Sequence, residues 1–293
     1  MPPGKKHLSL CAILAVRNEL HCLKLLLPLL AEQKIDVIII DNESTDGSHE
    51  LYSTLMSKPI IAVETLPYRG FFSLSEVLSL KQELYKKIDH DWVIHHDADE
   101  ILEHYKPGLT LRDAIQEADQ TGYNVLNFEE FVFLPEPNAD YFNRNYYTEL
   151  LRYYFFEPKK NRLNRAWKRS SQLSNAAAGG HNLNGSNALI APTNHILRHY
   201  IVLNEHHAQK KYLARSFSDI DLAKGWHAKR LTCTKENLLL PDKSNFLFRL
   251  NRYDSKEFCR TKPADKHFWQ WTKKTRPLLL KSLDALLRKI PSR

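Results

Sequence analysis

Residues 92–100 read Trp92-Val93-Ile94-His95-His96-Asp97-Ala98-Asp99-Glu100, a run of strand length that ends in three carboxyl side chains. The apolar start of this run predicts a short buried strand. In a parallel α/β sheet, ligands bind beyond the carboxyl ends of the strands. Acidic side chains directly after a buried strand are therefore candidates for a binding site, provided that the flanking chain forms a sheet of that kind.

The chain on both sides of this run alternates between strand and helix patterns. Predicted strands cover residues 8–16, 36–40, 59–66, 92–96 and 124–134. Predicted helices cover residues 19–33, 74–88 and 109–120, together with a segment that ends at Met56. Strands and helices that alternate at this spacing predict an α/β fold, with a mainly parallel, Rossmann-like sheet flanked by helices.

Beyond Pro135 the pattern is less regular. The chain is aromatic over residues 141–156, basic over 157–169, extended over 187–192 and 195–203, and helical within 203–224 and over 277–291. Residues 241–293 carry 14 Lys or Arg against 5 Asp or Glu, a net charge of +9, so residues 1–240 sum to −1 of the total of +8. We therefore predict a domain over residues 1–225 and a basic, largely helical extension over residues 226–293.

The composition narrows the class of protein. A 293-residue chain that is 43% hydrophobic and 11% aromatic is too apolar to be disordered. No apolar run approaches the ~18 residues that a membrane-spanning helix needs, and the first residues lack the apolar core of a signal peptide. Four cysteines without metal-site spacing (Cys11, Cys22, Cys233 and Cys259) favour reduced thiols and a cytoplasmic protein.

Asp97 and Asp99 lie two residues apart where the chain leaves the fourth predicted strand. Two converging carboxylates suit a hard divalent cation that keeps open positions for phosphate oxygens. The alternative is a solvated acidic loop in which Asp99 or Glu100 caps a helix.

Two further polar groups follow the ends of predicted strands. Residues 17–19 (Arg17-Asn18-Glu19) follow the first strand, and a loop from Asp41 to Ser48 follows the second. In a parallel sheet the two groups would be neighbours, and Asp41 would accept hydrogen bonds from a nucleobase or ribose. The alternative is an ordinary loop in which Ser44 or Asp46 caps the next helix.

A histidine-rich patch comprises His195, His199, His206 and His207. A single histidine is more often structural than a ligand. A site with two carboxylates nevertheless lacks a third ligand, and a neutral imidazole is suitable, so one of these histidines is a candidate.

Taken in order, three motifs resemble glycosyltransferase family 2, most closely its bacterial branch with a D-A-D-E motif. They are Val16-Arg17-Asn18-Glu19, then Ile40-Asp41-Asn42-Glu43-Ser44-Thr45-Asp46-Gly47-Ser48, then residues 92–100. The resemblance covers residues 8–135 and weakens towards residue 225. It implies the GT-A fold, a nucleotide-sugar donor, a divalent metal (Mn²⁺ or Mg²⁺) and transfer with inversion.

The resemblance also implies roles for individual residues. Arg17, Asn18, Glu19, Asp41, Asn42 and Asp97 would bind the nucleotide sugar, and Asp97, Asp99 and His199 would bind the metal. The segment Gly179-Gly180-His181 resembles the glycine-containing loop near the acceptor.

One departure from the family pattern concerns the general base. Many relatives carry a Glu-Asp pair between that loop and the late histidine, but no Asp or Glu occurs between Gly180 and His199. Glu129, Glu130 and His181 are the candidates that remain. Because side chains alternate along a strand, only one of the two glutamates faces the cleft.

We therefore expect an inverting, metal-dependent glycosyltransferase of the hexosyltransferase type, active in polysaccharide biosynthesis. A UDP- or GDP-sugar is the expected donor, and a glycan or glycolipid is the expected acceptor, with no role for nucleic acid. Two alternatives remain open. One is a metal-dependent phosphoesterase or nuclease, and the other is a catalytically degenerate GT-A binding module.

The C-terminal residues 276–293 predict a basic amphipathic helix, with its apolar face formed by Leu279, Leu283, Leu286, Leu287 and Ile290. Such a helix can lie against an anionic membrane. Alternatively, its apolar face packs on the domain. At most, we expect peripheral contact with the inner face of the membrane.

Overall fold

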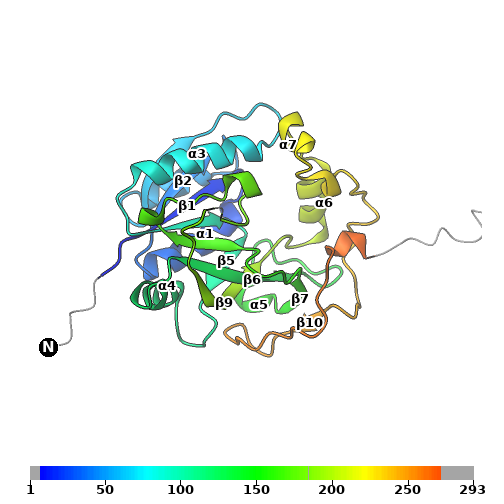
Figure 1. Cartoon of the computed structure of the whole chain (residues 1–293). Helices are drawn as coiled ribbons and strands as arrows, with labels where there is room; N and C mark the ends of the chain where they lie inside the picture. The colour runs from blue at the N-terminus through cyan, green and yellow to red at the C-terminus, as the bar shows by residue number, and fades with distance from the viewer. Residues whose placement is uncertain (1–6, 184, 272–293) are drawn as a thin grey trace, which may run out of the picture.

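A computed structural model describes residues 7–183 and 185–271 of the chain, which form an α/β fold around one sheet (Figure 1). The strands are β1 (Leu10–Val16), β2 (Asp36–Asp41), β3 (Ile60–Thr65), β4 (Trp92–Asp97), β5 (Glu100–Glu103), β6 (Val125–Phe133), β7 (Arg152–Phe156), β8 (Asn164–Lys168), β9 (Ile190–His199) and β10 (Phe248–Arg249). The helices are α1 (Leu20–Glu32), α2 (Ser48–Leu55), α3 (Leu74–Lys87), α4 (Leu111–Gln120), α5 (Tyr146–Glu149), α6 (Glu205–Leu213) and α7 (Asp219–Ala223). The predicted fold class is confirmed.

The sheet has a parallel half and a mixed half. Its strand order is β10-β7-β6-β8-β4-β1-β2-β3, and β9 pairs with β5 and β6 outside this path. Strands β4, β1, β2 and β3 are parallel neighbours, whereas β8 and β7 join antiparallel and β6 pairs in parallel with β9. The parallel half therefore presents the carboxyl ends of four adjacent strands along one edge.

Side chains of β1 alternate between two cores. Leu10, Ala12 and Leu14 belong to the core with the buried residues of α1, α2 and α4, whereas Cys11 and Ile13 pack with α3. Because both faces of a parallel sheet are covered by helices, its strands are apolar throughout. This explains why the sequence pattern of the first half located its elements well.

The second half of the chain forms a third core around the far ends of β6 and β7. Val132 and Tyr154 pack there with Tyr212 of α6 and with Phe268 and Trp269 near the end of the described chain. Residues 226–271 thus pack on the sheet as a strap, in which we find two 3₁₀ turns and β10 but no α-helix. Apolar residues in this segment occur in short consecutive groups, such as Leu238-Leu239-Leu240 and Phe246-Leu247-Phe248. The helix expected at residues 276–293 lies outside the described residues.

Helix α7 is tied to α3 across the sheet edge. The buried carboxylate of Asp221 accepts hydrogen bonds from the backbone N–H groups of Leu74 and Ser75 (2.6 and 3.1 Å) and from the Ser75 hydroxyl. These bonds cap the positive end of α3 with a negative charge. They hold α6 and α7 opposite the carboxyl ends of the strands (Figure 1).

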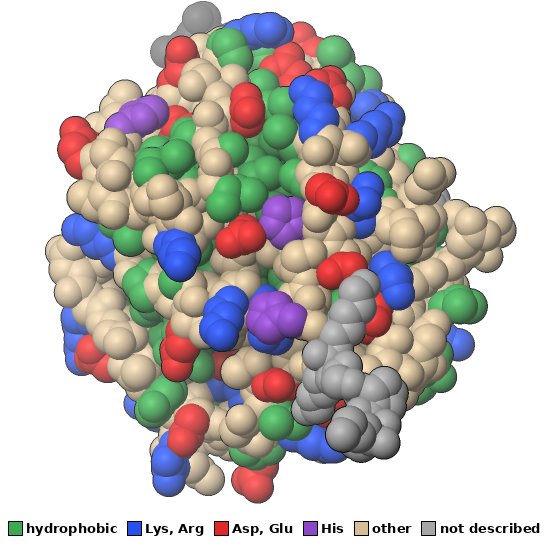
Figure 2. Space-filling view, turned by 90° about the vertical axis from the view of Figure 1, so that its left-hand side faces the viewer, with side chains coloured by type: hydrophobic (Ala, Val, Ile, Leu, Met, Phe, Trp, Pro, Cys, Tyr) green, Lys and Arg blue, Asp and Glu red, His purple; other side chains and the backbone are tan. Residues whose placement is uncertain are grey.

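The side of the molecule that lies at the left in Figure 1, away from α6 and α7, carries charges of both signs scattered between apolar side chains (Figure 2). Among the described residues, no helix combines the length and the apolar character needed to cross a bilayer. All four cysteines are free thiols.

Candidate functional site

The three polar groups found in the sequence meet at the carboxyl edge of the parallel strands. Val16 pairs with Asp41 in the register of β1 and β2, and Ala15 pairs with Asp97 in the register of β1 and β4. The expected proximity of residues 17–19 to the Asp41 loop is therefore confirmed.

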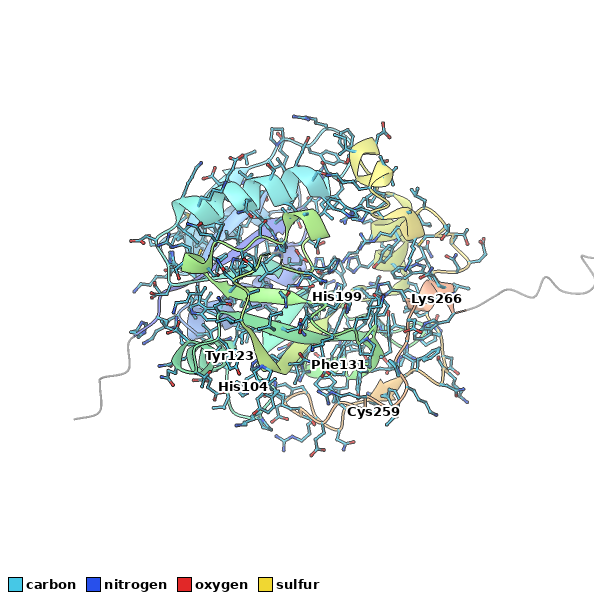
Figure 3. All side chains as sticks on the ribbon, in the orientation of Figure 1. His104, Tyr123, Phe131, His199, Cys259 and Lys266 are labelled. Carbon is cyan, nitrogen blue, oxygen red and sulfur yellow. The ribbon has the colours of Figure 1, made fainter. Side chains whose placement is uncertain are left out.

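A cavity of about 670 Å³ lies beyond this edge, between the sheet and α6. Its volume is within the usual range for a small-molecule site. Thirteen charged side chains line it: Arg17, Glu19, Lys81, Asp97, Asp99, Glu100, Glu130, Asp140, Arg165, Lys210, Lys211, Arg215 and Arg230. Figure 3 shows His199, another lining residue, on the side of the sheet that faces α6.

Asp97, the last residue of β4, is half-exposed to the cavity and has three cationic or imidazole neighbours. Its carboxylate lies 3.6 Å from Lys81 Nζ, 3.3 Å from an Arg165 guanidinium nitrogen and 3.9 Å from His95 Nε2. Burial favours the protonated acid, but the charges of Lys81 and Arg165 outweigh it and lower the pKa of Asp97. Asp97 therefore remains a carboxylate.

Asp99 forms a second cluster, two residues further along. Its Oδ2 atom lies 2.7 Å from Lys211 Nζ and 3.3 Å from His199 Nε2. On its other side, His199 Nδ1 lies 2.6 Å from Glu130 Oε1, and Glu130 also pairs with Arg162. Despite burial, these contacts lower the pKa of Asp99 and of Glu130 and raise that of His199 well above its usual value. His199 is thus an imidazolium held between two carboxylates.

The predicted metal ligands do not converge in this arrangement. Among the described residues, only Glu19, His21 and Cys22 place three candidate ligand atoms within 4.8 Å of one another. Asp97, Asp99 and His199 do not form such a group. Asp99 Oδ2 contacts the Lys211 ammonium and His199 Nε2. The donor set therefore does not fit a divalent cation.

Residues 17–19 hold the loop after β2. The Arg17 guanidinium donates hydrogen bonds to the carbonyl oxygens of Asn42 and Glu43 and lies 3.3 Å above the ring centre of Tyr68. The Asn18 side chain accepts a hydrogen bond from the N–H of Thr45 at 2.7 Å. Arg17, Asn18, Asn42 and Tyr68 all line one end of the cavity.

Asp41 does not reach the cavity, although it was expected to bind the nucleotide sugar. Its side chain is completely buried. It accepts hydrogen bonds from the Ser44 N–H and the Tyr52 hydroxyl, both at 2.7 Å. A carboxylate that the protein itself satisfies serves to shape the loop, so Asp41 acts on the site through the position of Asn42.

Glu19 lines the cavity close to Lys211 and Arg215. Burial raises its pKa, and the charge of Lys211 opposes that rise. Its Oε2 atom is buried without a hydrogen-bond partner.

The two glutamates of β6 face opposite sides, as strand alternation requires. Glu130 lines the cavity, whereas Glu129 does not and instead pairs with Arg260 at 2.7 Å. The expectation that only one of them faces the cleft is confirmed. Glu130 is a weak base because His199 and Arg162 stabilise its ionised form.

His181 is exposed at the cavity and follows two glycines. Gly180 has a φ of +83°, and a Cβ atom there would lie 3.0 Å from the His95 ring. Its carbonyl oxygen accepts hydrogen bonds from Asn175 and from Arg165 of β8, and the Asn175 side chain also contacts His95 of β4. Crowding by protein atoms, together with the charges of Arg165 and Arg162, lowers the pKa of His181 to about 4, so it is neutral at physiological pH.

The histidine patch divides in the structure. His199, His206 and His207 line the cavity. His195 is buried elsewhere, against the rings of His104 and Tyr105.

Several residues that line the cavity are not identified by the sequence patterns. They are Lys81, Arg165, Lys211, Arg215, Arg230 and Tyr68. A signal was present for two of them, because Lys211 and Arg215 are four residues apart in a predicted helix and so share a face. The sequence offers Glu100 as a candidate helix cap. In the structure its side chain is buried against Arg165, and burial raises the pKa of Glu100 to about 7.

No protein-family model and no curated protein matches this chain. Among solved structures it is similar to S. aureus TarS 1–349, with a TM-score of 0.42 and 15% identity, covering 70% of this chain and 63% of that one. For a longer S. aureus TarS chain the TM-score is 0.41, with 14% identity and coverage of 78% and 42%. For TarS 1–349 in complex with UDP the values are 0.39, 13%, 70% and 64%. This chain thus spans less than two thirds of the length of each.

Proposed function

We propose that the protein is an inverting glycosyltransferase that takes a sugar from a nucleoside-diphosphate donor and passes it to a hydroxyl acceptor. One observation carries this proposal: unpaired cations face the polar ends of the parallel strands across the cavity. Arg215 and Arg230 line the cavity, and neither forms an ion pair with any residue that the structure describes. Guanidinium groups that form no ion pair favour a phosphorylated ligand.

The residues that line the cavity offer groups for both parts of such a donor. Arg17, Asn42 and Tyr68 offer hydrogen-bonding groups and an aromatic ring to a nucleoside. Lys211, Arg215 and Arg230 offer positive charge to a diphosphate. A UDP- or GDP-sugar has both parts, and the proposed roles of Arg17, Asn18, Glu19, Asn42 and Asp97 in donor binding follow from this division.

His181 is the proposed general base. It is exposed to the cavity and neutral, whereas Glu130 is tied to two cations and Glu129 faces away. The negative charge of a bound diphosphate would raise the pKa of His181 towards neutrality, where proton transfer is most effective. An acceptor hydroxyl that gives its proton to His181 then attacks the sugar from the face opposite the diphosphate.

A metal-dependent phosphoesterase is disfavoured by the same geometry. It would need open carboxylates around a metal, but Asp97 and Asp99 are each paired with resident cations. Mn²⁺ or Mg²⁺ at Asp99 and His199 would have to compete with Lys211 for the Asp99 carboxylate.

The proposal is tested by mixing the full chain with a panel of nucleotide sugars and simple glycan or glycolipid acceptors. We expect one donor to raise the melting temperature and to release its nucleoside diphosphate when an acceptor is present. The variant Arg215→Met should lose both effects, whereas Lys229→Met should keep them because Lys229 is exposed and does not line the cavity. Cleavage of a phosphodiester without any response to nucleotide sugars would support the phosphoesterase instead.

A further inference from the structure

We infer that Lys211, and not a divalent cation, supplies the positive charge that neutralises the leaving diphosphate, so that the transfer needs no metal. This inference rests on the proposed function. The structural reason is that a protein cation already occupies the carboxylate on which a metal was expected.

The Lys211 ammonium lies 2.7 Å from Asp99 Oδ2, and His199 Nε2 approaches the same oxygen at 3.3 Å. The side chain of Lys211 is only 8% exposed, and that of Asp99 is 15% exposed. A metal that bound Asp99 Oδ2 would have to displace the Lys211 ammonium and the His199 ring and then lie beside the displaced ammonium. Charge repulsion in a partly buried site makes that unfavourable.

The backbone that carries Lys211 is held firmly. Ala208 and Tyr212, on the same helix, are buried in the core that includes Trp269, and the Tyr212 and Trp269 ring centres are 4.6 Å apart. The 2.7 Å contact with Asp99 Oδ2 fixes the position of the ammonium at the end of the Lys211 side chain. The charge is therefore preorganised at the cavity wall, as electrostatic stabilisation of a transition state requires.

Arg215 is a second source of positive charge in the cavity. It lines the same cavity just beyond α6 and is free of ion pairs among the described residues. Its guanidinium can donate two parallel hydrogen bonds to a phosphate. Lys211 and Arg215 thus both contribute positive charge to the cavity in which the diphosphate would lie.

The chemical step balances without a metal. The bond from the anomeric carbon to the diphosphate oxygen breaks, and its electron pair remains on that oxygen, where Lys211 and Arg215 stabilise the added negative charge. The acceptor oxygen forms the new bond to the anomeric carbon, and its proton passes to His181.

The test is binding of UDP and of GDP to the full chain by calorimetry, in excess EDTA and then in excess Mn²⁺. We expect at least one nucleotide to bind in EDTA, and Mn²⁺ to change its Kd by less than about threefold. In EDTA, Lys211→Met should weaken binding by roughly tenfold or more, because a charge-assisted hydrogen bond is lost. Lys229→Met removes one exposed lysine and should bind like the wild type.

Binding by the wild type only after Mn²⁺ is added would overturn the inference while leaving the proposed function intact. No binding of either nucleotide under both conditions would count against the proposed function as well. Lys211→Arg keeps a cation and should retain most of the affinity, which separates loss of charge from loss of the fold. Equal affinities for Lys211→Met and Lys229→Met would also refute the role of Lys211.

Discussion

His199 Nδ1 and Glu130 Oε1 lie 2.6 Å apart, although 69 residues separate them in the chain. The parallel pairing of β6 with β9 brings them together. His199 also contacts Asp99, and Asp99 pairs with Lys211 of α6. The contact between Glu130 and His199 therefore links β6 to α6. Glu130 therefore has a positioning role in the site.

The two glutamates of β6 provide a matched pair of variants. Glu130→Gln removes a buried charge that holds His199 and Arg162, so we expect activity to fall at least about tenfold. Glu129→Gln removes the charge paired with Arg260 outside the cavity, and we expect near-normal activity. Donor kcat and KM for both variants check this. Equal losses in the two would contradict the assigned faces.

Stability should depend on pH through the Glu130–His199 contact. Glu130 has a lowered pKa in the folded state, so its contribution is present above its unfolded value of about 4.5 and is lost as the pH falls through its folded pKa. His199 has a raised pKa, so its contribution is complete below 6.5 and declines as the pH rises towards its folded value.

The measured quantity is the difference in unfolding free energy between wild type and Glu130→Gln, obtained by urea titration across this range. We expect the difference to be largest between pH 4.5 and 6.5 and to shrink in more acidic solution. Taking the difference removes the contribution of other buried histidines. A difference that grows on acidification would contradict the ion pair.

His181→Gln should lower kcat by about 10²-fold or more, the usual contribution of a general base. Because His181 is exposed at the cavity and is assigned to the acceptor hydroxyl rather than to the nucleotide, nucleotide affinity should change little. Steady-state kinetics and nucleotide calorimetry separate the two effects. A variant that keeps its kcat would exclude His181 as the base.

Arg17→Met should weaken nucleotide binding by about tenfold. The guanidinium donates two hydrogen bonds to the loop after β2 and stacks on Tyr68, so its loss frees the residues expected to meet the nucleoside. Calorimetry gives the affinity, and Lys24→Met, which changes an exposed lysine on α1, is the control. Similar affinities for the two variants would place the nucleoside elsewhere.

Asp221→Ala should destabilise the protein by about 2 kcal/mol, because it removes the cap from the first turn of α3. The same bonds fix the start of α3, whose Leu74 and Val77 line the cavity, so nucleotide affinity should fall too. Urea unfolding and calorimetry measure these effects. Asp219→Ala, an exposed change on the same helix, should leave both quantities unaltered.

The sequence alone was enough to locate the parallel half of the sheet and its polar edge. Apolar runs such as Asp36–Asp41 are buried on both faces, and that requirement is written locally along the chain. Adjacent parallel strands also end at the same edge, so the nearness of residues 17–19, Asn42 and Asp97 followed from strand order.

Tertiary structure alone decided which charges meet. Lys211 is 112 residues from Asp99, and Arg165 is 68 residues from Asp97, so no local pattern reports these pairs. Burial likewise separated Asp41, satisfied by Ser44 and Tyr52, from Asn42, which reaches the cavity. Side-chain partners depend on the packing of distant segments. In this protein that packing pairs the two expected metal ligands Asp97 and Asp99 with Arg165 and Lys211.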